Sequence, residues 1–154
     1  MPADRLITDT SLDYVARRLR FLGYDVVTVR GVRLEALLEA GRREGRVVLT
    51  LSRRHPRRFA DVRVQRVPRG DPAAAVRQVA SAYAPATAPF SRCPRCNLEL
   101  ESREASAAGK DGPAENARQG QSLHFCATCR HWFWFGSHVD RIRQWLGNAL
   151  GRPL

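Results

Sequence analysis

All four cysteines of this 154-residue chain lie in two Cys-x-x-Cys pairs, Cys93–Cys96 and Cys126–Cys129. Two such turns can place four thiolates around one Zn²⁺ ion, in a tetrahedral site with no position open for substrate. Two disulfides or a redox-active pair would fit the same spacing. Disulfides are rare in cytoplasmic proteins, and a redox protein needs one Cys-x-x-Cys rather than a matched set. The spacing therefore predicts a structural zinc ribbon.

Length and composition limit the number of domains and the class of protein that the chain can form. At 44% hydrophobic residues, 154 residues can form one ordinary domain, or a small domain plus a metal-stapled module. No apolar run approaches the roughly 20 residues of a membrane span, and residues 1–8 lack the apolar core of a signal peptide. We expect a cytoplasmic protein with no membrane partner.

The net charge indicates a polyanionic partner. Lys and Arg number 26 against 15 Asp and Glu, a net charge of +11, and Lys110 is the only lysine. Arginine suits phosphate recognition better than lysine does, although a GC-rich gene would produce the same preference for arginine. Codon bias does not explain the shortage of acids, so nucleic acid is the leading partner class.

Composition divides the chain into three stretches. Residues 1–83 alternate short β-branched runs with helical patterns, residues 84–90 form a Pro/Ala linker, and residues 91–154 hold all the cysteines and tryptophans. We predict a domain boundary at the linker.

The first stretch predicts an α/β fold. Its β-branched runs predict four strands and its helical periodicities three helices, in the order strand, helix, strand, helix, strand, strand, helix. Ser11 and Asp71 are the expected helix N-caps, and Gly23 the expected stop of the first helix. The predicted strands are residues 5–8, 26–29, 47–51 and 62–67, and the predicted helices are residues 12–22, 34–41 and 72–82. Crossover connections imply a mainly parallel sheet covered by helices.

In such a sheet, ligands bind at the carboxyl ends of the strands. Asp9 follows the first strand and Ser52 follows the third, so both belong to this edge. Arg17 and Arg20 are expected on the exposed face of the first helix.

The cysteine-containing stretch has three further features. Residues 102–120 are polar and predict a flexible insertion at a hairpin tip. In residues 131–136, tryptophan and phenylalanine alternate along a predicted strand. We expect one face of this strand to form a small core, and the other face remains a candidate for base stacking. Residues 139–150 predict an amphipathic helix. His124, His131 and His138 could each replace a cysteine ligand, but four sulfurs already complete the shell.

The sequence also resembles a known family. The segments Leu6–Asp9, Val15–Asp25, Arg43–Arg46, Ser91–Asn97 and Trp134–His138 are similar, in order and spacing, to those of the Mut7-C ribonuclease family. The resemblance implies a PIN-like nuclease domain followed by a zinc ribbon. It also implies metal-dependent RNA cleavage by carboxylates at the strand ends, where Mg²⁺ or Mn²⁺ would be held.

Carried over to this chain, the resemblance makes Asp9 the first catalytic carboxylate and Glu35 the nearest match for the second. The family's third strand ends in Thr-Arg-Asp, whereas this chain reads Thr50-Leu51-Ser52. A neutral hydroxyl therefore replaces an anionic ligand, which should weaken a divalent site. Asp71 and Asp13 are possible substitutes, although capping explains Asp71.

The residues after Ser52 make this edge cationic. Arg53, Arg54, Arg57 and Arg58, together with Arg17 and Arg20, are the predicted RNA contacts. Three functions remain open: a metal-dependent ribonuclease, an RNA-binding protein that has lost the hydrolytic site, and a zinc-ribbon adaptor for a protein or ribonucleoprotein partner. Ser52 is the residue that favours the second function over the first.

Overall fold

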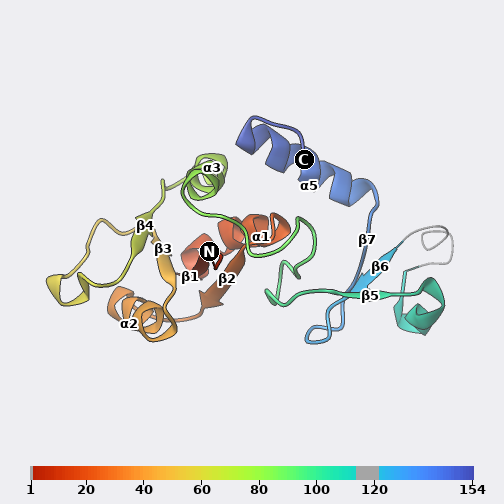
Figure 1. Ribbon diagram of the computed structural model, residues 1–154, viewed down its shortest axis with the longest axis horizontal. Coiled ribbons are helices and arrows are strands. Elements are labelled where there is room, and N and C mark those ends of the chain that lie inside the picture. Colours follow the sequence, from red (N-terminus) through yellow and green to blue (C-terminus); the bar gives the residue numbers. More distant parts are fainter. Residues whose placement is uncertain (1, 114–121) are drawn as a thin grey trace. The chain divides into compact units, whose positions relative to one another are not determined.

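The computed structural model describes residues 2–113 and 122–154 (Figure 1). Contacts within the chain define two compact units, residues 1–97 and 98–154, which are considered in turn. Among the described residues, no helix is both long and apolar enough to cross a membrane.

The first unit is an α/β layer structure, as predicted. Its four strands are all parallel, in the spatial order β2-β1-β3-β4. The strands are β1 (Arg5–Asp9), β2 (Asp25–Val29), β3 (Val47–Thr50) and β4 (Val64–Arg66). The helices are α1 (Asp13–Phe21), α2 (Leu34–Glu44) and α3 (Pro72–Ala82). Short 3-10 turns, η1 (Thr10–Leu12) and η2 (Arg57–Phe59), follow β1 and precede β4.

Helices cover both faces of the sheet because its strands are apolar on both sides. Ile7 and Val48 pack with Leu37 and Leu38 of α2 in one buried cluster. Side chains next to these in sequence point to the other face, where α1 and α3 contact each other (Figure 1). The sheet is therefore buried in the middle of three layers, and its strand ends are where polar side chains reach solvent.

Local signals set most of the boundaries. The Asp71 side chain caps α3 by accepting a hydrogen bond from Ala74 N at 2.9 Å, as predicted. Gly23, with φ of +92°, follows the end of α1, and a Cβ there would lie 2.0 Å from Thr87 O. The predicted cap at Ser11 is wrong: the side chain of Asp9 caps the η1 turn instead, and α1 begins after it.

The segment predicted as a linker is hydrogen bonded to the end of α1. Ala86 N and Thr87 N donate to Gly23 O at 3.0 and 3.1 Å, and Phe90 N donates to Phe21 O at 2.7 Å. Residues 86–90 are thus anchored to the α/β unit at several points.

The second unit contains a small antiparallel sheet, β5 (Glu101–Arg103), β6 (Leu123–Phe125) and β7 (Trp132–Trp134). Leu123, Phe125 and Trp132 form its buried core, against which Trp134 packs. The prediction that one face of the aromatic strand forms a core is confirmed. The predicted insertion contains regular structure: residues 102 and 103 belong to strand β5, and a 3-10 segment, η3 (Ala105–Asp111), follows. Residues 114–121 lie outside the described part.

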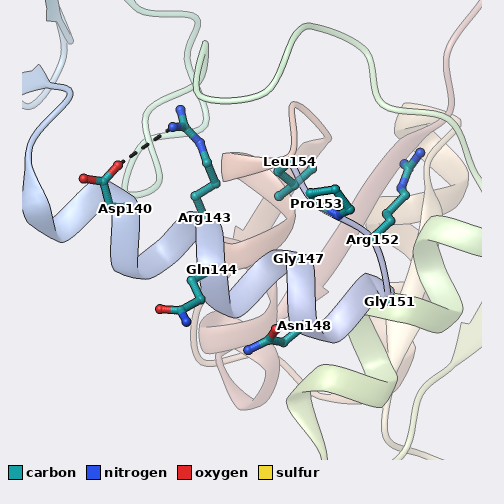
Figure 2. Close-up of a pocket in the computed structure, with 9 residues that line it drawn as sticks. All are labelled: Asp140, Arg143, Gln144, Gly147, Asn148, Gly151, Arg152, Pro153 and Leu154. Atoms are coloured by element: carbon teal, nitrogen blue, oxygen red, sulfur yellow. Dashed lines mark ion pairs between the residues drawn. The ribbon is translucent and has the colours of Figure 1, made fainter.

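Helix α5 (Ser137–Leu150) completes this unit. The chain then turns back at Gly151, and Arg152 N donates to Gly147 O at 3.1 Å. A surface pocket of 710 Å³ lies between helix α5 and the C-terminal residues 151–154 (Figure 2). It is lined by Asp140, Arg143, Gln144, Gly147, Asn148, Gly151, Arg152, Pro153 and Leu154. The one carboxylate side chain of this lining, Asp140, is ion-paired with Arg143 at 3.8 Å.

Candidate metal centre and nucleic-acid interface

The two Cys-x-x-Cys turns have the same backbone geometry. The fifth residue of each turn, Asn97 or Arg130, has a positive φ, of 68° and 55° respectively. In each turn the N–H of this residue donates to the carbonyl of the first cysteine, at 2.9 Å to Cys93 O and 2.8 Å to Cys126 O. Each cysteine pair is therefore held in a turn closed by the same hydrogen bond.

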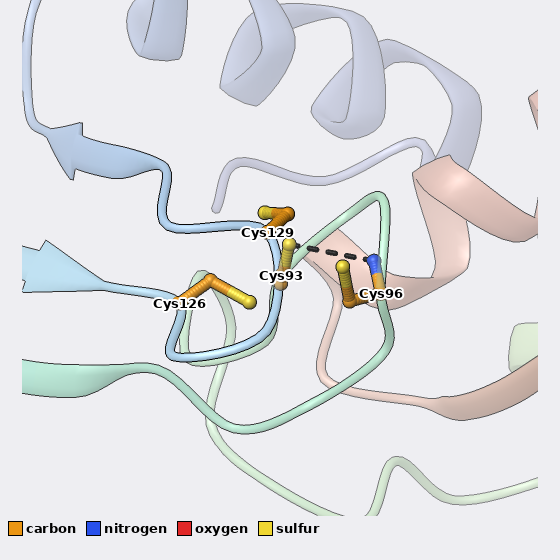
Figure 3. Close-up of side chains that lie close together, drawn as sticks. All are labelled: Cys93, Cys96, Cys126 and Cys129. Carbon is orange, nitrogen blue, oxygen red and sulfur yellow. Dashed lines mark hydrogen bonds between the residues drawn. The ribbon is translucent and has the colours of Figure 1, made fainter.

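The four sulfur atoms come together (Figure 3). The Sγ atoms of Cys93, Cys96, Cys126 and Cys129 lie within 4.8 Å of one another, and none is in a disulfide. Tetrahedral zinc–thiolate bonds of about 2.3 Å place sulfurs roughly 3.8 Å apart, so small movements would close this set on an ion. The donor set therefore fits a structural Zn²⁺ ion. The disulfide alternative is not realised.

The side chains of the three histidines of the second unit lie against aromatic rings. His124 meets Phe135 edge-on at 5.9 Å between ring centroids, His131 lies 5.3 Å from the ring of Phe133, and His138 is 6.5 Å from that of Trp134. Among the described residues, the four cysteines form the only group of three or more possible metal ligands.

Asp9 lies at the carboxyl end of β1, in the middle of the parallel sheet, but its carboxylate is engaged locally. Its Oδ1 accepts hydrogen bonds from Ser11 N at 2.8 Å and from Ser11 Oγ. Asp13 is ion-paired with Arg17, Nε to Oδ2, at 2.9 Å. Both carboxylates thus have partners within their own turn of chain.

Glu35 lies in the first turn of α2, which begins at the same edge of the sheet. Its Oε1 lies 3.5 Å from Arg54 and 4.0 Å from Arg58, so two arginines share one carboxylate oxygen. A divalent cation bound to this oxygen would lie close to both guanidiniums. Because like charges repel, Glu35 in this arrangement serves as a counter-ion for arginine.

Ser52 has a structural role in the loop after β3. Its N–H donates to Thr50 Oγ1 and its own Oγ accepts from Arg54 N, both at 3.0 Å. His55 Nε2 donates to Phe59 O at 2.7 Å and closes the same loop. The hydroxyl therefore fixes the loop that carries the arginines, but adds no negative charge. As they stand, Asp9 and Glu35 do not fit a site that needs three carboxylates.

Arg20 is not a surface residue. Its side chain is 3% exposed, and its guanidinium donates to Val26 O, Pro94 O and Thr28 Oγ1 at 2.7–2.9 Å. Burial lowers the pKa of this guanidinium, a shift that the nearby carboxyl of Asp13 opposes. The expectation that Arg20 lies on the exposed face of the helix is corrected, because all three of its nitrogens are used inside the fold. Arg17, by contrast, is exposed.

The topology adds arginines that sequence reasoning missed. Arg30 and Arg33 lie between β2 and α2, and Arg69 lies between β4 and α3, so all three follow a strand and precede a helix at the edge that holds Asp9. Each is exposed. The strand order was needed to place them beside the loop after β3. We name the whole set the strand-end arginines: Arg30, Arg33, Arg53, Arg54, Arg57, Arg58 and Arg69.

The geometry thus defines an α/β protein with a four-cysteine cluster that could hold a metal ion and with a basic strand-end edge. A family model, the Mut7-C RNAse domain, matches residues 4–146, nearly the whole chain. The chain belongs to the Mut7-C RNAse domain family. No curated protein and no solved structure matches it.

Proposed function

We propose that this protein binds RNA along the strand-end edge of its parallel sheet and that the hydrolytic site there is incomplete. The pairing of Glu35 with Arg54 and Arg58 is the main support for this proposal. An edge that directs two guanidiniums at a carboxylate oxygen is suited to a phosphate oxygen, which arginine recognises with the same fork of donors.

Charge and family membership support RNA as the ligand. The strand-end arginines extend over the loops after β2, β3 and β4, and the chain carries a net charge of +11. A phosphodiester backbone is the common polyanion that such a row of cations would bind. The family is a ribonuclease family, so RNA is the natural choice among nucleic acids.

A metal-dependent ribonuclease is the second candidate, with Asp9 and Glu35 as its catalytic pair and Mg²⁺ or Mn²⁺ as its cofactor. Family membership and the place of Asp9 after the central strand β1 favour it. Two features argue against a ribonuclease: Ser52 is neutral, and Glu35 is paired with arginines. Binding without hydrolysis is therefore our primary proposal. We assign Zn²⁺ to the four cysteines, as a structural ion.

The test uses the full chain and a labelled single-stranded RNA. We expect binding that weakens steeply with salt, and Arg54→Ala/Arg58→Ala should reduce the slope of log K against log salt by about 1.4, at roughly 0.7 per phosphate contact. The matched control is Arg43→Ala/Arg63→Ala, which removes two ion-paired arginines from the opposite edge of the sheet. Equal losses in both variants would contradict a strand-end site.

Cleavage is measured in the same reaction after Mn²⁺ or Mg²⁺ is added. Cleavage that Asp9→Asn abolishes would establish the second candidate, whereas cleavage that survives this change would indicate a contaminating nuclease. Absence of RNA binding at low salt would overturn both proposals and leave the adaptor function.

A further inference from the structure

The buried guanidinium of Arg20 is bonded to the first cysteine turn. Its Nη1 donates to Pro94 O, which lies between Cys93 and Cys96, at 2.8 Å. Its other nitrogens donate to Val26 O at 2.9 Å and to Thr28 Oγ1 at 2.7 Å, so one side chain ties the turn to β2. A lysine ammonium, a single point of charge, could not span acceptors spread over the planar fork of arginine.

A second set of bonds holds the end of the same turn. Asn97 accepts from Val26 N through Oδ1 at 2.9 Å and donates from Nδ2 to Asp25 Oδ1 at 2.7 Å. Arg92 Nη1 donates to Asn97 O at 2.7 Å. The turn is thus fixed to the α/β unit at its middle, through Pro94, and at its end, through Asn97, while the Arg92 side chain closes the turn on itself.

The charge of Arg20 also matters to the sulfurs. Arg20 donates to the carbonyl of Pro94, between Cys93 and Cys96, so its guanidinium lies beside the cysteine turn, and Cys93 is fully buried. Four thiolates around Zn²⁺ carry a net charge of −2, which is costly to bury without a compensating cation. A permanently protonated guanidinium at this position offsets part of that charge.

We propose that Arg20 is a positioning residue for the metal centre: it holds the Cys93–Cys96 turn in a ligand-ready geometry and supplies a buried cation beside its thiolates. This inference rests on the assignment of Zn²⁺ to the four cysteines. A turn that is already ordered loses less conformational entropy when the metal binds, so the α/β unit contributes directly to metal affinity.

The test measures metal affinity in the full chain, by zinc competition with a chelator of known affinity and by the absorption spectrum of the Co²⁺-substituted protein. Arg20→Met should weaken zinc binding about 10- to 100-fold, the usual cost of losing a group that orients metal ligands. Arg20→Lys should recover part of the loss, because it restores the charge without the three bonds. Arg43→Met, an exposed arginine on α2, is the control and should leave the affinity unchanged.

A merely structural role for Arg20 gives a different result. In that case Arg20→Met would lower the urea midpoint of metal-free and zinc-loaded protein equally, with zinc affinity and the Co²⁺ spectrum unchanged, and the proposal would be overturned. Asn97→Gly provides a second variant, since glycine keeps the positive φ of this position while removing both side-chain bonds. It should also weaken zinc binding, and an unaltered affinity in both variants would contradict the proposal. A wild-type protein that binds neither Zn²⁺ nor Co²⁺ would instead overturn the zinc assignment itself.

Discussion

The cysteine cluster and the strand-end edge are both built from side chains distant in sequence, yet they differ in how their donors are used. The four sulfurs converge within 4.8 Å, on two turns of identical backbone design. The carboxylates of Asp9 and Glu35 are instead occupied by Ser11 and by two arginines. Four sulfurs that converge can bind a metal ion. A carboxylate that is already hydrogen bonded or ion-paired within the protein instead neutralises the charge of its partner. This difference separates the proposed metal-binding part of the protein from its proposed RNA-binding part.

The largest expected effect comes from removing one sulfur. Cys126→Ser should reduce zinc from about one ion per chain to almost none after dialysis against a mild chelator, because structural zinc sites depend on all four ligands. Metal analysis measures the change. Thr128→Ala, an exposed non-ligand in the same turn, is the control and should keep its zinc. Zinc retained by Cys126→Ser would show that the cluster is not the metal site.

The next largest effect should come from adding the missing carboxylate. In Ser52→Asp, a side-chain oxygen can still accept from Arg54 N, so the loop is expected to persist. The new charge should raise Mn²⁺ affinity about tenfold, because the number of anionic ligands sets much of a divalent site's affinity. Electron paramagnetic resonance of free Mn²⁺ gives the measurement. Ser81→Asp places the same charge at the far end of α3 and should bind no extra ion.

A smaller change is expected at Glu35. If Glu35 is paired with arginines that RNA would otherwise bind, Glu35→Gln should raise RNA affinity. We expect an increase of about two- to fivefold, because exposed ion pairs contribute little free energy. Glu39→Gln is a matched control on the same helix, where the carboxylate pairs with Arg42 at 3.2 Å. Fluorescence anisotropy compares the two variants. The same gain in both would mean that only net charge matters.

The smallest expected effect is a pH dependence at Asp25. Burial raises the pKa of this carboxyl, but hydrogen bonds from Arg46 and Asn97 and the charges of Arg46 and Arg92 outweigh burial and leave it below its ordinary value of 3.8. The ionised form is therefore favoured by folding. Its contribution to stability is complete above the ordinary pKa and is lost as the pH falls through the lower pKa of the folded state.

Asp25→Asn should consequently lower the urea midpoint at pH 7, and the deficit should shrink at an acid pH well below the ordinary pKa of 3.8. Urea unfolding of both proteins at the two pH values provides the comparison. A deficit that stays constant with pH would exclude a contribution from the charge of Asp25.

Much of the fold could be predicted because it rests on local patterns. The β-branched runs indicated the strands of the first unit and helical periodicity indicated its helices. Asp71 indicated the start of α3. Arg20 could not be placed correctly, since helical periodicity sets its side chain opposite the apolar face, whereas its acceptors come from β2 and from the distant residue Pro94. The partners of Glu35 were likewise beyond reach, because they depend on the course of the loop after β3.

We propose that the four cysteines hold a metal ion and that the strand-end carboxylates hold none. Titration of the zinc-loaded wild-type protein with Mn²⁺, followed by electron paramagnetic resonance, tests it most directly. We expect no tight Mn²⁺ binding, and a titration curve that Asp9→Asn leaves unchanged. Stoichiometric Mn²⁺ binding that Asp9→Asn abolishes would contradict it.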